Sequence, residues 1–301
     1  MEKGRFAPSP TGRMHLGNVF SALLSWLSVK CKGGEWLLRI EDIDPQRSRQ
    51  QWADLLMSDL EWLGLTWDGT PVYQHERSDI YQHYYDLLQK RGLTYPCFCT
   101  RADILATQAP HESDGRVVYK GTCRHLPPQP GRKGATRLIV PSETISFVDG
   151  HYGEQHVDLQ TQVGDFIIRR KDGAWAYQLA VVIDDALTGV TEVVRGRDLL
   201  LSSPQQMYVA DLLGFTPPRY YHFPLLCTRE ADGQLRRLSK RDLSMDMQAL
   251  RQRYTPEQLL GLLAHLAGLQ AQSTPTTPVE LLAHFSWEKV PHHDILTSEN
   301  I

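Results

Sequence analysis

Residues 5–18 read RFAPSPTGRMHLGN, and this stretch decides the fold of the chain. It begins as a short strand, passes through a turn rich in proline and serine, and continues as a helix. Pro8 and Pro10 push the residue before each of them out of helical geometry, which favours a turn. From Leu16 onward, apolar residues recur at three- and four-residue steps, as they do on the buried side of a helix. The stretch therefore predicts a strand–turn–helix unit.

A strand–turn–helix unit of this kind can bind phosphate groups. The first N–H groups of a helix are unpaired and carry partial positive charge, so they attract anions. His15 lies at the predicted start of the helix, where its ring can donate to a phosphate oxygen. A plain connection with a surface histidine would explain the same residues, so a second signal is needed.

The second signal is the stretch 236–241, RRLSKR, about 220 residues further along the chain. Together the two stretches resemble the paired signatures of the class I aminoacyl-tRNA synthetases, with HLGN at 15–18 and RLSKR at 237–241. Asn18 stands where the first signature has its second histidine, and Arg237 where the second signature has its first lysine. The flanking residues 5–12 look like the glutamyl branch of that family.

The resemblance implies both an activity and a set of site residues. Enzymes of the glutamyl branch activate L-glutamate with ATP, which carries Mg²⁺. The resemblance implies that His15 and Lys240 are the catalytic donors to the phosphates. The residues implied to bind ATP are His15, Gly17, Asn18, Arg237, Ser239 and Lys240, and those implied to bind glutamate are Arg5, Ser9, Glu41, Tyr177 and Arg195.

Carboxylates also follow the predicted strand 35–40, EWLLRI. In open α/β sheets ligands gather at the carboxyl ends of the strands, which suits the implied role of Glu41 toward the α-amino group of glutamate. Asp44 precedes Pro45, and this pair is equally typical of the start of a helix.

Three of the five cysteines, Cys97, Cys99 and Cys123, fall within 27 residues. Zinc takes four nitrogen, sulfur or oxygen ligands in a tetrahedron, and paired cysteines in short loops supply them. Three buried thiols would explain the same residues. By ligand type the natural fourth ligand is His125, followed by His111.

The resemblance selects a different fourth ligand. In the glutamyl-queuosine tRNA(Asp) synthetases a C-x-C … Y-x-x-x-C pattern binds zinc through three cysteines and a tyrosine. Here the pattern falls on Cys97, Cys99, Tyr119 and Cys123, which implies one structural zinc ion.

The predicted fold class is α/β. We expect a Rossmann-like class I synthetase catalytic domain split into residues 1–94 and 175–228. Residues 95–174 are expected to form an inserted, β-rich, zinc-bearing subdomain. Residues 229–301 are expected to hold the second signature, of the KMSKS type, and a short helical tail.

Composition restricts compartment and partners. No apolar run reaches the about 20 residues of a membrane span, and the N-terminus shows no signal peptide. Five cysteines in 301 residues favour a reduced, cytoplasmic protein. A net charge of −3 is not that of a general nucleic-acid binder, although residues 229–253 carry seven basic against four acidic residues. We expect a monomer without membrane contact.

The tail bears on the acceptor. Only 57 residues follow Ser244, too few for the anticodon-binding domain of a glutamyl-tRNA synthetase. The resemblance is therefore best to the glutamyl-queuosine tRNA(Asp) synthetases. It implies tRNA-independent formation of glutamyl-adenylate, then transfer of glutamate to the queuosine base at the wobble position of the tRNA(Asp) anticodon arm. The alternatives are a truncated glutamyl-tRNA synthetase that charges a tRNA 3′ end, or a non-catalytic zinc-bearing tRNA-binding module.

Overall fold

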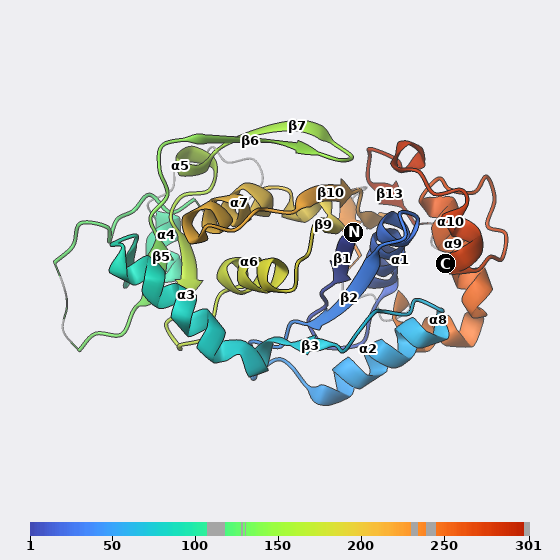
Figure 1. The fold of residues 1–301 in the computed structure, drawn as a ribbon, viewed down its shortest axis with the longest axis horizontal. Coiled ribbons are helices and arrows are strands. Elements are labelled where there is room, and N and C mark those ends of the chain that lie inside the picture. The colour runs from blue at the N-terminus through green and yellow to red at the C-terminus, as the bar shows by residue number, and fades with distance from the viewer. Residues whose placement is uncertain (107–117, 128, 130, 230–233, 239–244, 298–301) are drawn as a thin grey trace.

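The computed structural model describes residues 1–106, 118–127, 129, 131–229, 234–238 and 245–297 (Figure 1). The helices are α1 (Leu16–Lys30), α2 (Gln50–Trp62), α3 (Ser78–Lys90), α4 (Arg101–Ala106), α5 (Leu159–Gln162), α6 (Tyr177–Leu187), α7 (Ser202–Leu213), α8 (Met247–Arg253), α9 (Pro256–Leu266) and α10 (Pro278–Leu282), with short 3-10 turns η1 (Gln74–Arg77), η2 (Arg197–Leu199) and η4 (Trp287–Lys289). The strands are β1 (Lys3–Phe6), β2 (Glu35–Ile40), β3 (Val72–Tyr73), β4 (Thr94–Cys97), β5 (Ala135–Leu138), β6 (Thr144–Asp149), β7 (Gly153–Asp158), β8 (Phe166–Arg169), β9 (Glu192–Gly196), β10 (Arg219–Phe223), β11 (Leu226–Arg229), β12 (Leu235–Arg237) and β13 (Ile295–Leu296).

Parallel strands form the centre of the molecule. Strand β1 pairs with β2, β2 pairs with β3, and β9 pairs with β10, in each case in parallel. The N–H of Thr191 donates to the carbonyl of Lys3 at 2.8 Å, which places the start of β9 beside β1. The spatial order is therefore β3, β2, β1, β9, β10, and the carboxyl ends of these strands share one edge. This arrangement confirms the predicted α/β class.

Helix α1 follows β1 through the predicted turn. His15 is its N-cap: the His15 Nδ1 atom accepts from the N–H of Gly17 at 3.1 Å. The Oδ1 atom of Asn18 accepts from the N–H of His15 at 3.1 Å, which completes a capping box. The apolar positions of α1 are buried in one core with apolar side chains of α8, α9 and α10. The tail thus packs on the first helix (Figure 1).

Antiparallel strands fill the segment between the two halves of the sheet. Strands β4, β5 and β8 form one small sheet, and β6 and β7 form a long hairpin. Figure 1 shows this hairpin lying along the top of the molecule toward β10 and β13. At its turn the N–H of Gly150 donates to the Tyr220 carbonyl of β10 at 2.8 Å, so the hairpin reaches the parallel sheet.

Several local predictions differ from the structure. Helix α2 begins at Gln50, because Asp44 opens a hydrogen-bonded turn instead of a helix. Ser78 is of a residue type that favours a helix N-cap, yet the N-cap of α3 is Arg77, and the Ser78 hydroxyl accepts from the indole of Trp175. Strand β7 was not predicted, because most of its side chains are polar.

Helix α6 begins at Tyr177, after its N-cap Ala176, and contains both Asp184 and Asp185. Among the described residues, no helix is long and apolar enough to cross a membrane.

Candidate active site

A cavity of about 400 Å³ opens at the carboxyl ends of β1 and β9. Nine of the predicted site residues line it: Arg5, Ser9, His15, Gly17, Asn18, Glu41, Tyr177, Arg195 and Arg237. Ser239 and Lys240, the other two residues predicted to bind ATP, lie outside the described residues. The structure therefore brings the first signature stretch and Arg237 of the second to the walls of one cavity.

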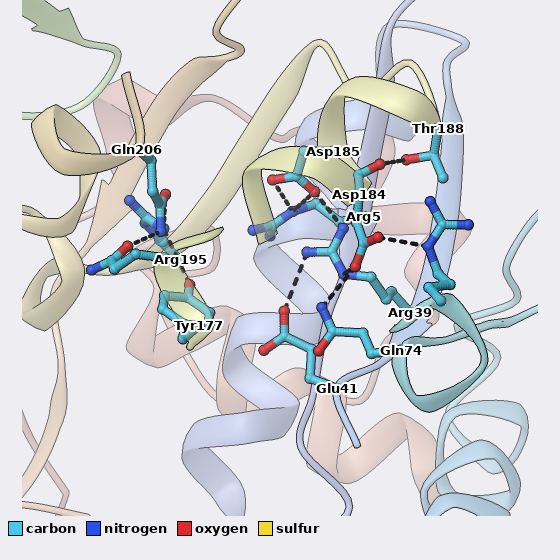
Figure 2. Close-up of polar contacts among 12 residues, drawn as sticks. Arg5, Arg39, Glu41, Gln74, Tyr177, Asp184, Asp185, Thr188, Arg195 and Gln206 are labelled. Carbon is cyan, nitrogen blue, oxygen red and sulfur yellow. Dashed lines mark hydrogen bonds and ion pairs between the residues drawn. The ribbon is translucent and has the colours of Figure 1, made fainter. Parts of the chain in front are cut away.

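An ionic network centred on Asp185 of α6 lies behind the cavity and reaches its wall through Arg5 and Glu41. The Asp185 carboxylate accepts from Arg5 Nε at 3.2 Å and pairs with the Nη1 atom of Arg39, and all three side chains are buried (Figure 2). Burial opposes the charge of Asp185, but the two guanidinium groups outweigh it and hold the pKa of this carboxyl below its ordinary value. Burial likewise opposes the charge of Arg39, while the carboxylates of Asp185 and Glu41 raise its pKa.

Asp184 extends the network away from the cavity. Its carboxylate accepts from Gln74 Nε2 at 2.7 Å, from Arg77 Nε at 2.6 Å and from the Tyr81 hydroxyl at 2.8 Å. Three donors satisfy this fully buried carboxylate, as burial requires. Asp184 thereby ties α6 to η1 and α3, which fixes the helix that carries Asp185.

The network leaves specific atoms to a ligand. Within the described residues, the Nη atoms of Arg5 make no hydrogen bond to protein, although the Nε atom is anchored to Asp185. Glu41 accepts from Arg39 Nη2 through Oε1 at 3.2 Å, and its Oε2 atom has no such partner there. Burial raises the pKa of the Glu41 carboxyl, opposed by Arg39 and Arg5. The two side chains therefore offer a guanidinium edge and a carboxylate oxygen to the cavity.

Arg195, at the end of β9, is held more completely. Its Nη1 atom donates to Gln206 Oε1 at 2.8 Å and to the Tyr177 hydroxyl at 3.3 Å (Figure 2). Its Nη2 atom donates to Ser203 Oγ at 2.7 Å and its Nε atom to His222 Nε2 at 3.1 Å. Within the part of the chain that the structure describes, these contacts occupy four of the five N–H groups of the guanidinium and leave one on Nη2.

The N-terminus of α1 forms another part of the cavity wall. Because His15 Nδ1 accepts from the helix, the neutral ring carries its proton on Nε2. Arg237 reaches the cavity from β12 and pairs with Asp198 of η2. The described part of the predicted basic patch is thus partly used within the chain, since Arg251 also pairs with Asp59.

The cysteine cluster lies away from this cavity. The sulfur atoms of Cys97, Cys99 and Cys123 all lie within 4.8 Å of one another. The Tyr119 hydroxyl lies 3.6 Å from Cys99 Sγ and accepts from the N–H of Cys123 at 2.8 Å. Among the described residues His125 is exposed and does not join the cluster, and His111 lies outside them.

The cluster has the dimensions of a metal site. Two sulfurs bound to one tetrahedral zinc at about 2.3 Å lie about 3.8 Å apart, and the Sγ atoms of Cys99 and Cys123 are 3.5 Å apart. Without a cation, burial raises the pKa of the Cys99 thiol to about 11. A divalent cation would favour the thiolate form, so the donor set fits zinc.

Sequence reasoning missed the residues that support the site. Arg39 was read only as part of an apolar strand, although a charged residue in a buried strand signals a buried partner. Asp184 and Asp185 follow a mostly apolar segment, and nothing beside them in the sequence indicates the arginines that they pair with. Gln206, Ser203 and His222 have no local signature, because their roles arise only when α7 and β10 meet Arg195.

Comparisons with known proteins cover the whole chain. Residues 3–290 match the family described as tRNA synthetases class I (E and Q), catalytic domain. The chain is 42% identical to the Glutamyl-Q tRNA(Asp) synthetase of Nitratidesulfovibrio vulgaris, over 100% of this chain and 97% of that protein. It is also 42% identical to the protein of that name from Neisseria meningitidis, over 99% of this chain and 100% of that protein.

A solved structure shows the same architecture. The crystal structure of a glutamate tRNA ligase from Elizabethkingia meningosepticum in complex with its amino acid superposes with a TM-score of 0.82 at 28% identity. The match covers 99% of this chain and 67% of that longer chain.

Proposed function

The chain belongs to the family of class I tRNA synthetases for glutamate and glutamine, and on this premise we propose that it activates L-glutamate with ATP and passes the glutamyl group to queuosine at the wobble position of tRNA(Asp). The family predicted from the two signatures and the predicted catalytic fold are confirmed by the comparisons. The substrates, the acceptor and the residue roles are the proposal.

The observation that carries the proposal is the set of charges at the cavity. Glu41 presents a carboxylate oxygen, while Arg5 and Arg195 present guanidinium N–H groups. Glutamate has one ammonium and two carboxylate groups, which is the complementary set. Arg5 can bind one carboxylate through both of its Nη atoms, and Arg195 can donate its remaining Nη2 N–H to the other, so the pair favours a dicarboxylic amino acid.

The first step joins glutamate to ATP. An oxygen of the α-carboxylate attacks the α-phosphorus, the bond to the β-phosphate oxygen breaks, and pyrophosphate leaves. Such a reaction depends on positioning and charge stabilisation. The Nε2 proton of His15, the N-terminus of α1 and Lys240 would donate to the phosphates, with Mg²⁺ on ATP.

We also propose that Ser9 helps to bind glutamate. The further residues proposed to bind ATP are Gly17, Asn18, Arg237 and Ser239. Glutamine would be rejected because its amide leaves an arginine without a charged partner.

Glutamate-dependent ATP–pyrophosphate exchange tests this step. We expect exchange in protein freed of all tRNA, because the proposed activation residues all lie on the chain itself. An absolute requirement for tRNA would contradict the proposal. Absence of exchange under any condition would favour the non-catalytic binding module.

The second step rests on the names of the relatives, which cover nearly the whole chain. We expect an isolated tRNA(Asp) anticodon stem-loop carrying queuosine to be glutamylated, and its guanosine counterpart not. The likeness to a glutamate tRNA ligase supports one alternative, charging of a tRNA 3′ end. An acceptor minihelix that is glutamylated while the stem-loop stays uncharged would establish that alternative.

The remaining predictions belong to the same proposal. One structural zinc ion would be held by Cys97, Cys99, Tyr119 and Cys123, and would order the antiparallel region without touching a substrate. A reducing compartment such as the cytoplasm suits free thiols. The domain division and a monomeric state stay predictions.

A further inference from the structure

A chain of buried hydrogen bonds runs from Arg195 to the β6–β7 hairpin. Arg195 Nε donates to His222 Nε2 at 3.1 Å, so this nitrogen of the imidazole must be the unprotonated one. The other nitrogen, Nδ1, then carries the proton and donates to Asp149 Oδ2 at 2.6 Å. His222 and Asp149 are 0% and 1% exposed, so the three groups interact away from water.

Asp149 is fixed as an ionised acceptor. It ends β6, and its Oδ1 atom accepts from the backbone N–H groups of Tyr152 at 2.9 Å, His151 at 3.1 Å and His222 at 3.3 Å. Burial disfavours the charge, but these hydrogen bonds and that from the imidazole hold the pKa of Asp149 below its ordinary value. The carboxylate therefore accepts and does not donate toward His222.

The hairpin brings Asp149 to this place from outside the parallel sheet. The β6–β7 hairpin belongs to the segment between β5 and β8, and Figure 1 shows it reaching β10. His222 lies on β10, beside β9 with Arg195. These hydrogen bonds therefore connect the segment between the two halves of the sheet to Arg195 at the cavity, where we propose that glutamate binds.

We propose that Asp149 and His222 are positioning residues that hold the Arg195 guanidinium in place for a carboxylate of glutamate. The inference rests on the proposed function. Asp149 fixes the His222 tautomer with its lone pair toward Arg195. With the other tautomer, a proton on Nε2 would face the Nε–H of Arg195, and the two donors would repel.

The test is the Asp149→Asn variant in glutamate-dependent ATP–pyrophosphate exchange. An amide can donate to Nδ1 and so favour the wrong tautomer. We expect the KM for glutamate to rise at least tenfold, with the KM for ATP within about twofold of wild type. Glu154→Gln is the matched control, because Glu154 lies on the same hairpin with its side chain 80% exposed, and it should leave both values unchanged.

A second variant separates positioning from mere support of the hairpin. The side chain of His222→Gln has no tautomers, and its oxygen can turn toward Arg195 whatever stands at position 149. Combined with Asp149→Asn, it should bring the KM for glutamate back to within about threefold of wild type. If Asp149→Asn does not fold, His222→Gln against His222→Ala carries the test: the glutamine variant should keep a low KM for glutamate and the alanine variant should not.

The outcomes separate this inference from the proposed function. Three results would overturn the positioning role of Asp149 and His222 and leave the proposed function intact. They are a wild-type KM for glutamate in Asp149→Asn, an equal rise in both KM values, and no recovery in the double variant. If wild-type protein shows no exchange, the proposed function fails. Calorimetric titration with glutamate then still tests the positioning role, which predicts at least tenfold weaker binding of glutamate in Asp149→Asn.

Discussion

The arginine–carboxylate network behind the cavity and the cysteine cluster of the antiparallel region place buried ionisable groups together in opposite ways. In the network, acids meet bases of the same chain: Asp185 binds Arg5 and Arg39, and Asp184 accepts from Arg77. In the cluster, three thiols and a phenol converge, and all four are weak acids. In the first arrangement folding alone pairs each acid with a base, whereas the second fits a cation that the chain does not supply.

Because of this difference, the network should be sensitive to the loss of a charged side chain and the cluster to the loss of a metal ion. A network closed by internal pairs should respond to loss of one partner, because the remaining charge is then buried alone. A cluster closed by a metal should respond to loss of that metal, because the ligands then have no common partner. Perturbing the two regions in parallel therefore tests whether the comparison holds.

Removal of the metal should have the largest effect. Structural zinc contributes about 10–16 kcal/mol of binding free energy in small zinc domains. We therefore expect Cys99→Ser, or chelation, to release the zinc and to expose the residues between β4 and β8 to protease. Elemental analysis and mass spectrometry of the digest measure both effects.

Cys31→Ser is the control, since Cys31 is exposed and outside the cluster. His125→Ala should keep its zinc and Tyr119→Phe should bind it more weakly. The reverse result would give the fourth position to histidine, and a wild type without zinc would remove the contrast between the two regions.

Loss of one acid from the network should rank second. Asp185→Asn leaves Arg5 and Arg39 buried without their shared carboxylate, and breaking a buried pair costs about 3–5 kcal/mol. Urea denaturation should show that decrease in the free energy of unfolding. Asp172→Asn breaks the exposed pair with Arg170 and should cost less than about 1 kcal/mol. Equal effects of the two substitutions would mean that the buried network adds no stability of its own.

A substitution in the second signature should change catalysis and spare the fold. Lys240→Ala removes one donor to the phosphates, and loss of such a donor typically costs about 3 kcal/mol of transition-state stabilisation. We expect activation to slow by about 10²-fold or more, with an unchanged unfolding midpoint. Lys171→Ala, in the exposed turn before α6, is the control. Exchange near the wild-type rate would remove Lys240 from the proposed mechanism.

The sequence was sufficient for elements whose signal is local. The helix from Leu16 and the strand 35–40 both follow from the periodicity of their apolar residues. Recognition of the signatures placed nine residues at one cavity. What could not be predicted was pairing between distant elements, such as Asp184 with Arg77 or His222 with Asp149, because neither partner carries a local sign of the other.

The smallest effect is expected at Asp59, a buried carboxylate of α2. It tests whether an opposite charge alone is enough to stabilise a buried acid. Its Oδ1 atom lies 3.3 Å from Arg251 Nε of α8, yet neither carboxylate oxygen has a hydrogen-bond partner within the described residues. Burial raises the pKa of Asp59 to about 6, against the charge of Arg251. A nearby opposite charge therefore does not by itself stabilise this buried carboxylate. Asp59 lacks hydrogen-bond donors like those that satisfy Asp184.

The sign of the pH dependence follows from that shift. The folded state favours the protonated acid, whose ordinary pKa is 3.8, so the unfolding free energy should fall as pH rises from about 4 to about 6. Asp59→Asn is neutral throughout and should match wild type at pH 4.5. At pH 7.5 it should be more stable by about 1–2 kcal/mol, since each pKa unit corresponds to about 1.4 kcal/mol and the amide also lacks partners. Asp54→Asn, exposed on the same helix, should show no such trend in urea denaturation at the two pH values. If Asp59→Asn is less stable than wild type at pH 7.5, the ion pair with Arg251 outweighs the cost of burying Asp59. Asp59 would then resemble the acids of the network, which are stabilised by bases of the same chain.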